Sequence, residues 1–281
     1  MVEDRRLGDA IAYVILTIGV LICAFPVWLT FVASTWDNAT IINGQLPLYP
    51  GPHFLDNYYR ILFVGTSGST REPVASMMLN SFVMAMTIAL GKIFISVLSA
   101  YAIVYYRFPF RMAAFWIIFV TLMLPVEVRI FPTFKIVSDL GMLDSYQGLA
   151  VPLIASATGT LLFRQFFTIP DELLEASKID GAGPFKFFKD TVLPLSLTTI
   201  AALFVIQFIY GWNQYLWPLL ITTKDSMQTI VIGIRKMITT SDALTEWQLA
   251  MATAMLAMLP PVFVVIAMQR LFVKGLVETE K

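Results

Sequence analysis

Long stretches without a charged residue constrain this chain more than any other feature. The run from Ala10 to Trp36 is uncharged and much longer than the ~18 apolar residues that mark a helix able to cross a membrane. Further apolar stretches follow it. The next one covers about residues 80–104, and Lys92 is the only charged residue in it. Charged residues make up 14% of the chain, against about 25% in a typical soluble domain. The sequence therefore predicts an all-α integral membrane protein.

Six transmembrane helices are expected, within a single membrane domain over residues 1–281. The first stretch is too long for a signal-peptide core and has no small-residue cleavage site, so we expect a retained helix. Glu127 and Arg129 come directly after Pro125, where we expect the third helix to bend or break. The expected spans are about 11–33, 80–104, 112–134, 146–166, 198–221 and 248–270.

The placement of lysine and arginine predicts the orientation of the chain. Because the number of spans is even, both termini lie on one side of the membrane. That side carries the larger share of the basic residues, including those of the short loop from Tyr105 to Arg111. Basic loops stay in the cytoplasm, so we expect both termini there, together with the segment 170–194 between the fourth and fifth spans.

The segment 170–194 is charged and helix-prone, although it lies between two apolar stretches. It opens with Pro170 and Asp171, and proline and acidic residues favour the first turn of a helix. Gly181 supplies a stop that tolerates a left-handed backbone, and Gly183-Pro184 restarts a helix. We expect a short helix lying across the membrane face, followed by an amphipathic lead into the fifth span. Taken alone, such a hairpin is more often a solvated interfacial loop.

Three pieces of this segment resemble the loop with which membrane subunits of type I ABC importers dock onto their ATPase. They are Glu175-Ala176-Ser177, Asp180-Gly181-Ala182 and Leu193-Pro194. Serine stands where the family usually has a second alanine, a change between small residues. The resemblance implies a type I ABC importer permease fold with a cytoplasmic coupling helix, in which these residues couple the chain to an ATPase. It covers residues 75–275 approximately, and flanks such as Arg107-Phe108-Pro109 resemble the carbohydrate-uptake branch.

Within that branch, two segments look most like the permeases that take up glycerol 3-phosphate. They run from Leu122 to Pro132 and from Phe208 to Trp217. The resemblance implies uptake of sn-glycerol 3-phosphate, or a related glycerophosphodiester, across a bacterial inner membrane, with sugar or polyol uptake as the alternative. It also implies four kinds of partner: a homologous second permease subunit, two copies of an ATPase subunit, a periplasmic solute-binding protein, and membrane lipid.

ATP hydrolysis is expected in a partner, because the chain lacks the glycine spacing of a phosphate-binding loop. Gly91-Lys92 is followed by Ile93 and has no earlier glycine at the required position. No cofactor, metal site or nucleic-acid partner is expected, since the chain has one histidine, one cysteine and a formal net charge of zero. The shortage of acid, base and nucleophile groups disfavours a membrane enzyme. A secondary transporter or a channel is the alternative class.

Polar residues within the expected spans are the candidates for a translocation pathway, because charges are costly in a membrane and usually face a cavity or a partner. Lys92 and Arg129 suit an anionic substrate such as a glycerol phosphate. The alternatives are that Lys92 pairs with Glu127, or that Arg129 marks the outer interface. The fifth span adds Asn213, Gln214 and Tyr215, whereas the flanking Trp212 and Trp217 also suit packing between helices.

Overall fold

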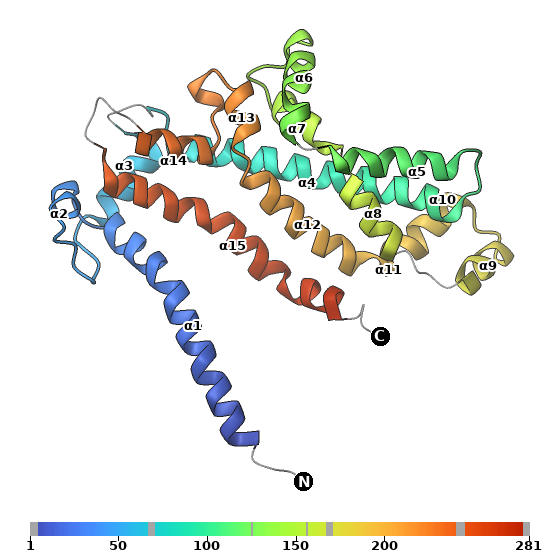
Figure 1. Cartoon of the computed structure of the whole chain (residues 1–281), viewed down its shortest axis with the longest axis horizontal. Coiled ribbons are helices and arrows are strands. Elements are labelled where there is room, and N and C mark those ends of the chain that lie inside the picture. Colours follow the sequence, from blue (N-terminus) through green and yellow to red (C-terminus); the bar gives the residue numbers. More distant parts are fainter. Residues whose placement is uncertain are drawn as a thin grey trace. The chain divides into compact units, whose positions relative to one another are not determined.

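Helices are the only regular secondary structure in the described part of this computed structural model, which covers residues 5–66, 71–124, 126–155, 157–166, 171–239 and 245–277. The chain falls into two compact units. The first consists of Met1–Ser76 and Gly233–Leu259, and the second of Met77–Ile232 and Pro260–Lys281. Figure 1 labels the helices in chain order.

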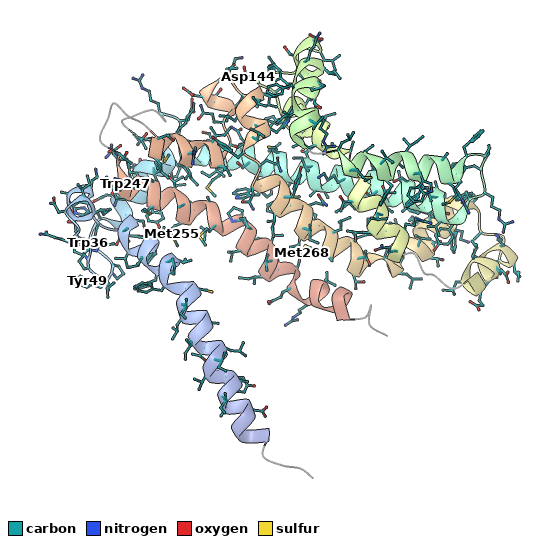
Figure 2. All side chains as sticks on the ribbon, in the orientation of Figure 1. Trp36, Tyr49, Asp144, Trp247, Met255 and Met268 are labelled. Atoms are coloured by element: carbon teal, nitrogen blue, oxygen red, sulfur yellow. The ribbon has the colours of Figure 1, made fainter. Side chains whose placement is uncertain are left out.

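The first unit begins with the long helix α1 (Arg5–Ser34). Large apolar side chains are exposed along α1 from Ile11 to Phe25 (Figure 2), as on a helix that faces lipid or another membrane segment. The unit also holds two short helices and parts of two others: α2 (Asn38–Ile42), α3 (Phe54–Phe63), α14 (Ile230–Thr239) and α15 (Trp247–Val277).

Polar contacts in the first unit hold the start of α15. The Asn38 side chain donates to the Thr245 carbonyl and accepts from the Trp247 amide, each at 3.0 Å. Arg60 in α3 forms a salt bridge with Glu246, with 2.7 Å between Nη2 and Oε1. The first amides of a helix have no partner within the helix, so Asn38 caps α15 from a distant part of the chain.

The second unit is organised around α4 (Val74–Tyr105), which α8 and α12 approach closely. A Cβ added at Gly159 in α8 would lie 2.2 Å from Ser96 Oγ, and one added at Gly211 in α12 would lie 2.9 Å from Ala85 Cα. Small residues of this kind let membrane helices pack backbone against backbone. The other elements of this unit are α5 (Arg111–Val120), a 3₁₀ turn (Thr121–Met123), α6 (Val126–Asp139), α7 (Tyr146–Ile154), α8 (Ala157–Phe166), α9 (Asp171–Ile179), α10 (Pro184–Phe187), a π-helical turn (Phe188–Val192), α11 (Leu193–Leu195), α12 (Leu197–Trp212), α13 (Leu216–Ile221) and a second 3₁₀ turn (Asp225–Met227).

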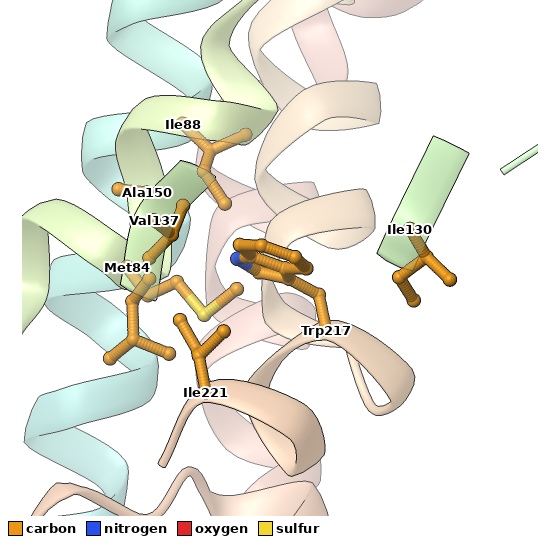
Figure 3. Close-up of a cluster of buried hydrophobic side chains, with 8 residues drawn as sticks. Met84, Ile88, Ile130, Val137, Ala150, Trp217 and Ile221 are labelled. Carbon is orange, nitrogen blue, oxygen red and sulfur yellow. The ribbon is translucent and has the colours of Figure 1, made fainter. Parts of the chain in front are cut away.

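A buried apolar cluster joins α4, α6, α7 and α13 (Figure 3). Trp217 lies among its members and donates its indole N–H to the Gly148 carbonyl at 3.0 Å, so its polar atom is satisfied. Within a membrane, lipid is as apolar as these side chains, and close packing rather than escape from water therefore favours the cluster. Its members are Met84, Ile88, Ile130, Val137, Leu149, Ala150, Trp217 and Ile221.

Within the part of the chain that the structure describes, three helical stretches are long and apolar enough to cross a membrane singly, namely Gly8–Ser34, Val74–Tyr105 and Trp247–Leu271. Two bent pairs meet the same criteria only when each is taken together: Tyr146–Ile154 with Ala157–Gln165, and Pro184–Leu195 with Leu197–Trp212. The apolar helix α5 is shorter, and the break expected in the third span lies between Met123 and Val126. Pro125 itself lies outside the described residues. The count of six spans stays a prediction.

Asp144 joins the loop after α6 to the loop after α13 (Figure 2). Its carboxylate accepts from the Thr223 amide at 2.6 Å, the Thr223 hydroxyl at 2.5 Å and the Lys224 amide at 2.9 Å. These bonds, the one from the Thr223 hydroxyl first, hold the pKa of Asp144 below its usual range. The carboxylate is therefore ionised at neutral pH, and its contribution is lost only as the pH falls below about 4.

Replacing Asp144 with glycine is expected to release the loop after α13. Asp144 has a φ of +51°, which glycine adopts without strain, so the variant loses the carboxylate and keeps the backbone conformation. We expect hydrogen exchange of the Thr223 and Lys224 amides to accelerate about tenfold, as for the loss of a charge-assisted hydrogen bond. Mass spectrometry of peptides from this loop measures the change, with α4 peptides as the internal control. Unchanged exchange would show that the Asp144 carboxylate does not hold the loop after α13 in place.

Candidate functional site

The hairpin expected at residues 170–194 starts with α9, and its turn has the geometry of a Schellman motif. The Ala182 amide donates to the Ser177 carbonyl at 2.9 Å, and the Gly181 amide donates to the Lys178 carbonyl at 3.1 Å. Gly181 has a φ of +69°, the left-handed conformation that this motif requires. The predicted helix stop at Gly181 is therefore confirmed, whereas Pro170 lies outside the described residues.

The return arm of the hairpin leads into α12 at an angle. Gly183 is extended at the N-cap and Pro184 is the first residue of α10, as the Gly183-Pro184 pair predicts. The arm then contains the π-helical turn Phe188–Val192, a rare element that occurs often at functional sites. The whole arm Pro184–Leu195 is bent by 71° from α12. The expected lead into the fifth span is therefore helical, and it meets α12 at a sharp bend.

One face of the hairpin is anchored in the second unit. Phe187 and Val192 of the return arm are buried beside Phe163 of α8, and Leu174 of α9 and Leu193 pack against the same cluster. The Ser177 hydroxyl donates to the Leu174 carbonyl at 2.8 Å, so serine at this position is satisfied within α9. The hairpin is thus a structured extension of the helical core, rather than a loosely attached loop.

The other face of the hairpin is exposed and mixes charged with apolar residues. Glu175, Ala176 and Asp180 are all exposed there. Ile179 is 86% exposed and Phe185 is 76% exposed, on either side of the turn. Large apolar side chains exposed beside charges, in a segment that is otherwise too polar for the membrane interior, are typical of a protein–protein interface. This face can dock a soluble partner.

The candidate pathway residue Lys92 is buried in the second unit, with 5% of its surface exposed. Its Nζ lies 3.8 Å from the centre of the Tyr210 ring in α12, a cation–π contact. Among the side chains that the structure describes, no carboxylate lies within 4.0 Å of this amine. Arg129 is close enough for the two cations to repel one another. The side chain of Glu127 lies outside the described residues, so its pairing with Lys92 stays untested.

Lys92 lies near the middle of α4 between two polar junctions. At one junction, Asn80 donates to the Ser226 carbonyl at 2.8 Å and accepts from the Tyr146 hydroxyl at 2.7 Å. At the other, Tyr101 donates to the Pro184 carbonyl of the return arm. Tyr101 lies 21 residues after Asn80, a rise of about 31 Å at 1.5 Å per residue, which equals the thickness of a bilayer's hydrocarbon core.

The run 198–221 predicts one continuous helix for the fifth span, with Asn213, Gln214 and Tyr215 inside it. The structure instead places these three residues between two helices. α12 ends at Trp212 and α13 begins at Leu216, so the three residues form the break between them. The Gln214 amide donates to the carbonyl of Tyr210 at 3.1 Å, next to the Lys92 contact. Irregular backbone at this depth is tolerated where protein buries it or where it lines a polar cavity, so these residues remain candidates.

Reasoning from the sequence missed Tyr210 and the two exposed apolar residues of the hairpin. The signal for Tyr210 was Lys92 itself, because a lone cation in an apolar run needs a partner, and an aromatic face is one of few that such a run offers. The signal for Ile179 and Phe185 was their apolar character in a segment that has to stay outside the membrane.

Comparison with known proteins identifies a family. Residues 92–278 match the family described as the inner membrane component of binding-protein-dependent transport systems. The chain is 57% identical, over 282 aligned residues and 100% of both chains, to the sn-glycerol-3-phosphate transport system permease protein UgpE of Brucella melitensis. The UgpE proteins of Rhizobium meliloti and Yersinia pestis show the same identity and the same coverage.

A solved structure shares the fold. It is a chain of a bacterial ABC transporter involved in the import of the acidic polysaccharide alginate, with a TM-score of 0.81. The match covers 96% of this chain and 98% of that chain, at 20% sequence identity. At this level of identity, the match is evidence for the fold alone.

Proposed function

We propose a transport function for this chain because it belongs to the family of inner membrane components of binding-protein-dependent transport systems. The proposed substrate is sn-glycerol 3-phosphate, or a related glycerophosphodiester. One observation carries this choice, namely 57% identity over the whole length with permease proteins named for sn-glycerol-3-phosphate transport. In this function the chain is the permease subunit of an ATP-binding cassette importer and does not itself hydrolyse ATP.

The proposed assembly contains a homologous second permease subunit, two copies of an ATPase subunit and a periplasmic solute-binding protein. The exposed face of the hairpin, with Glu175, Ala176, Asp180 and the apolar side chains of Ile179 and Phe185, supports docking of the ATPase. In the proposed assembly the hairpin and both termini lie in the cytoplasm. The basic loops on the same side of the predicted spans favour that orientation.

The proposed mechanism converts closure of the ATPase pair into a movement of the hairpin. Ala176 and Ala182 allow close approach of the partner, and Glu175 and Asp180 accept hydrogen bonds from basic or amide groups. Because the hairpin is anchored through Leu174 and the return arm, it moves as a rigid lever with the core helices. The helices then open the pathway to the periplasm, where the binding protein releases its substrate.

The proposed pathway passes Lys92, near the middle of α4, and Arg129. The burial of Lys92 within the hydrocarbon depth and the nearby Arg129 favour an anionic solute over a neutral sugar. Gln214 and Tyr215, in the break after α12, add hydrogen-bonding groups next to Tyr210. Together these groups suit a small molecule with one phosphate and several hydroxyls.

Reconstitution tests this function. The chain is co-purified with its second permease and ATPase, placed in proteoliposomes, and supplied with the binding protein and radiolabelled sn-glycerol 3-phosphate. We expect uptake that requires ATP, with maltose not transported. ATP-driven uptake of maltose would instead establish a sugar importer. Uptake driven by an ion gradient without any ATPase would contradict the proposal and point to a secondary transporter.

A further inference from the structure

Tyr101, near the end of α4, contacts the return arm of the hairpin through both its hydroxyl and its ring, a contact that the sequence does not predict. Its side chain is 8% exposed. Its hydroxyl lies 2.7 Å from the Pro184 carbonyl and 3.0 Å from the Tyr106 hydroxyl. The Pro184 carbonyl only accepts, so Tyr101 donates its single proton there and Tyr106 is the donor in the second bond.

Aromatic rings surround this hydroxyl and extend the contact. The Tyr101 ring centre lies 4.8 Å from that of Phe188 and 5.3 Å from that of Tyr106. The neighbouring ring of Tyr105 meets Phe187 edge-on at 5.5 Å. Such ring pairs stabilise a contact beyond the area that they bury. The same apolar cluster includes the adjacent residue Ala100 and, one turn earlier in α4, Val97.

The location of this contact gives it a mechanical consequence. Tyr101 and Lys92 lie on the same helix, nine residues and so about 14 Å apart. Pro184 is the first residue of the return arm, and the helix that it begins, α10, directly precedes the π-helical turn Phe188–Val192. A displacement of the hairpin therefore reaches α4 directly at Tyr101, without passing first through α12.

We propose that Tyr101, with its hydrogen bond to the Pro184 carbonyl and its aromatic contacts to the return arm, is the positioning residue that transmits movement of the hairpin to α4 and so to the pathway. The inference rests on the proposed transport function. It assigns to Tyr101 a role in coupling that is separate from docking of the ATPase and from contact with the substrate. In this proposal the hydroxyl bond fixes the position of α4 relative to the return arm, and the ring contacts keep the two elements rigidly connected.

The test is Tyr101→Phe in the reconstituted complex, with sn-glycerol 3-phosphate uptake and ATP hydrolysis measured in the same vesicles. The variant keeps the ring contacts and removes both hydroxyl bonds. We expect the number of molecules taken up per ATP to fall about fivefold, the change that one lost hydrogen bond makes in an equilibrium. Tyr106→Phe is the matched control: it also removes a tyrosine hydroxyl but spares the bond to Pro184, and its ratio should stay close to that of the unsubstituted complex.

The ratio separates coupling from folding. If Tyr101 only supports the fold, uptake and hydrolysis fall together and the ratio is unchanged, which overturns the inference, as does a variant that behaves like the unsubstituted complex. If the complex with Tyr101→Phe does not assemble, Phe188→Leu tests the same contact between α4 and the return arm from the side of the hairpin. The same fall is expected there, and an unchanged ratio again overturns the inference. Failure of the unsubstituted complex to couple uptake to ATP would instead count against the proposed function.

Discussion

Replacing Gly181 with tryptophan is expected to abolish ATP-driven transport, while the chain still inserts into the membrane and assembles with its second permease. The residue has a φ of +69°, and a Cβ added there meets no atom of this chain within 4 Å. A large side chain therefore clashes with no neighbouring atom of the chain, although it bears the cost of the left-handed backbone, and it fills the space where we propose that the ATPase docks. We expect transport to fall more than about thirtyfold, as when an interface hot spot is lost.

Two further substitutions at Gly181 separate bulk from backbone strain. Alanine imposes the cost of a left-handed conformation, about 1–2 kcal/mol, without the bulk. Asparagine tolerates that conformation better and is also small. We expect both to keep most of the transport that Gly181→Trp loses, with stimulation of ATP hydrolysis by the binding protein as the second readout. Normal coupling in the tryptophan variant would contradict docking at this turn.

Charge reversal at Glu175 tests the same face from α9. The side chain is exposed, and the change to lysine removes an acceptor and places a cation where the partner is expected to supply donors. Glu175→Gln is the matched control, because it removes the charge and keeps the shape. We expect loss of transport in the lysine variant, a smaller loss in the glutamine variant, and normal membrane levels of both by immunoblot.

The hairpin could be predicted from the sequence because local chemistry determines it. A helix that ends in a left-handed residue needs glycine, and a helix that starts after an extended residue accepts proline, so Gly181 and Gly183-Pro184 fix the turn without reference to the rest of the chain. The all-α membrane fold was likewise predicted, and the family and the solved ABC transporter confirm it. Both features depend on short-range patterns or on composition alone.

The break after α12 could not be predicted in this way. The run from Thr191 to Thr223 carries no charge, and hydropathy averaged over such a run does not distinguish one straight helix from two shorter elements. The bends depend on tertiary contacts. Gly211 packs against Ala85 of α4, and the indole N–H of Trp217 donates to the Gly148 carbonyl of α7. For the contact of Lys92, the sequence signals that the amine needs a partner but does not identify Tyr210, since the two residues are far apart in the sequence.

Replacing Lys92 with methionine is expected to reduce uptake of sn-glycerol 3-phosphate about tenfold, the effect of losing one charge-assisted hydrogen bond. Methionine keeps an unbranched, flexible side chain of similar length, so the packing around the buried stem survives while the charge is lost. At Tyr210, phenylalanine preserves the aromatic face and leucine removes it, so only Tyr210→Leu should weaken uptake. Initial rates in proteoliposomes measure these effects, and unchanged uptake in Lys92→Met would remove Lys92 from the pathway.

A double substitution separates recognition of the substrate from a pairing of Lys92 with Glu127. If Lys92 only neutralises Glu127, the single change leaves an uncompensated charge within the membrane, and Lys92→Met combined with Glu127→Gln should restore uptake. If Lys92 contacts the phosphate of the substrate, removal of Glu127's charge cannot replace the lost cation, and the double variant stays as impaired as Lys92→Met. We expect the second result, because the partner that the structure describes for Lys92 is the Tyr210 ring, and a cation at the position of Arg129 cannot replace a contact made by the Lys92 amine itself.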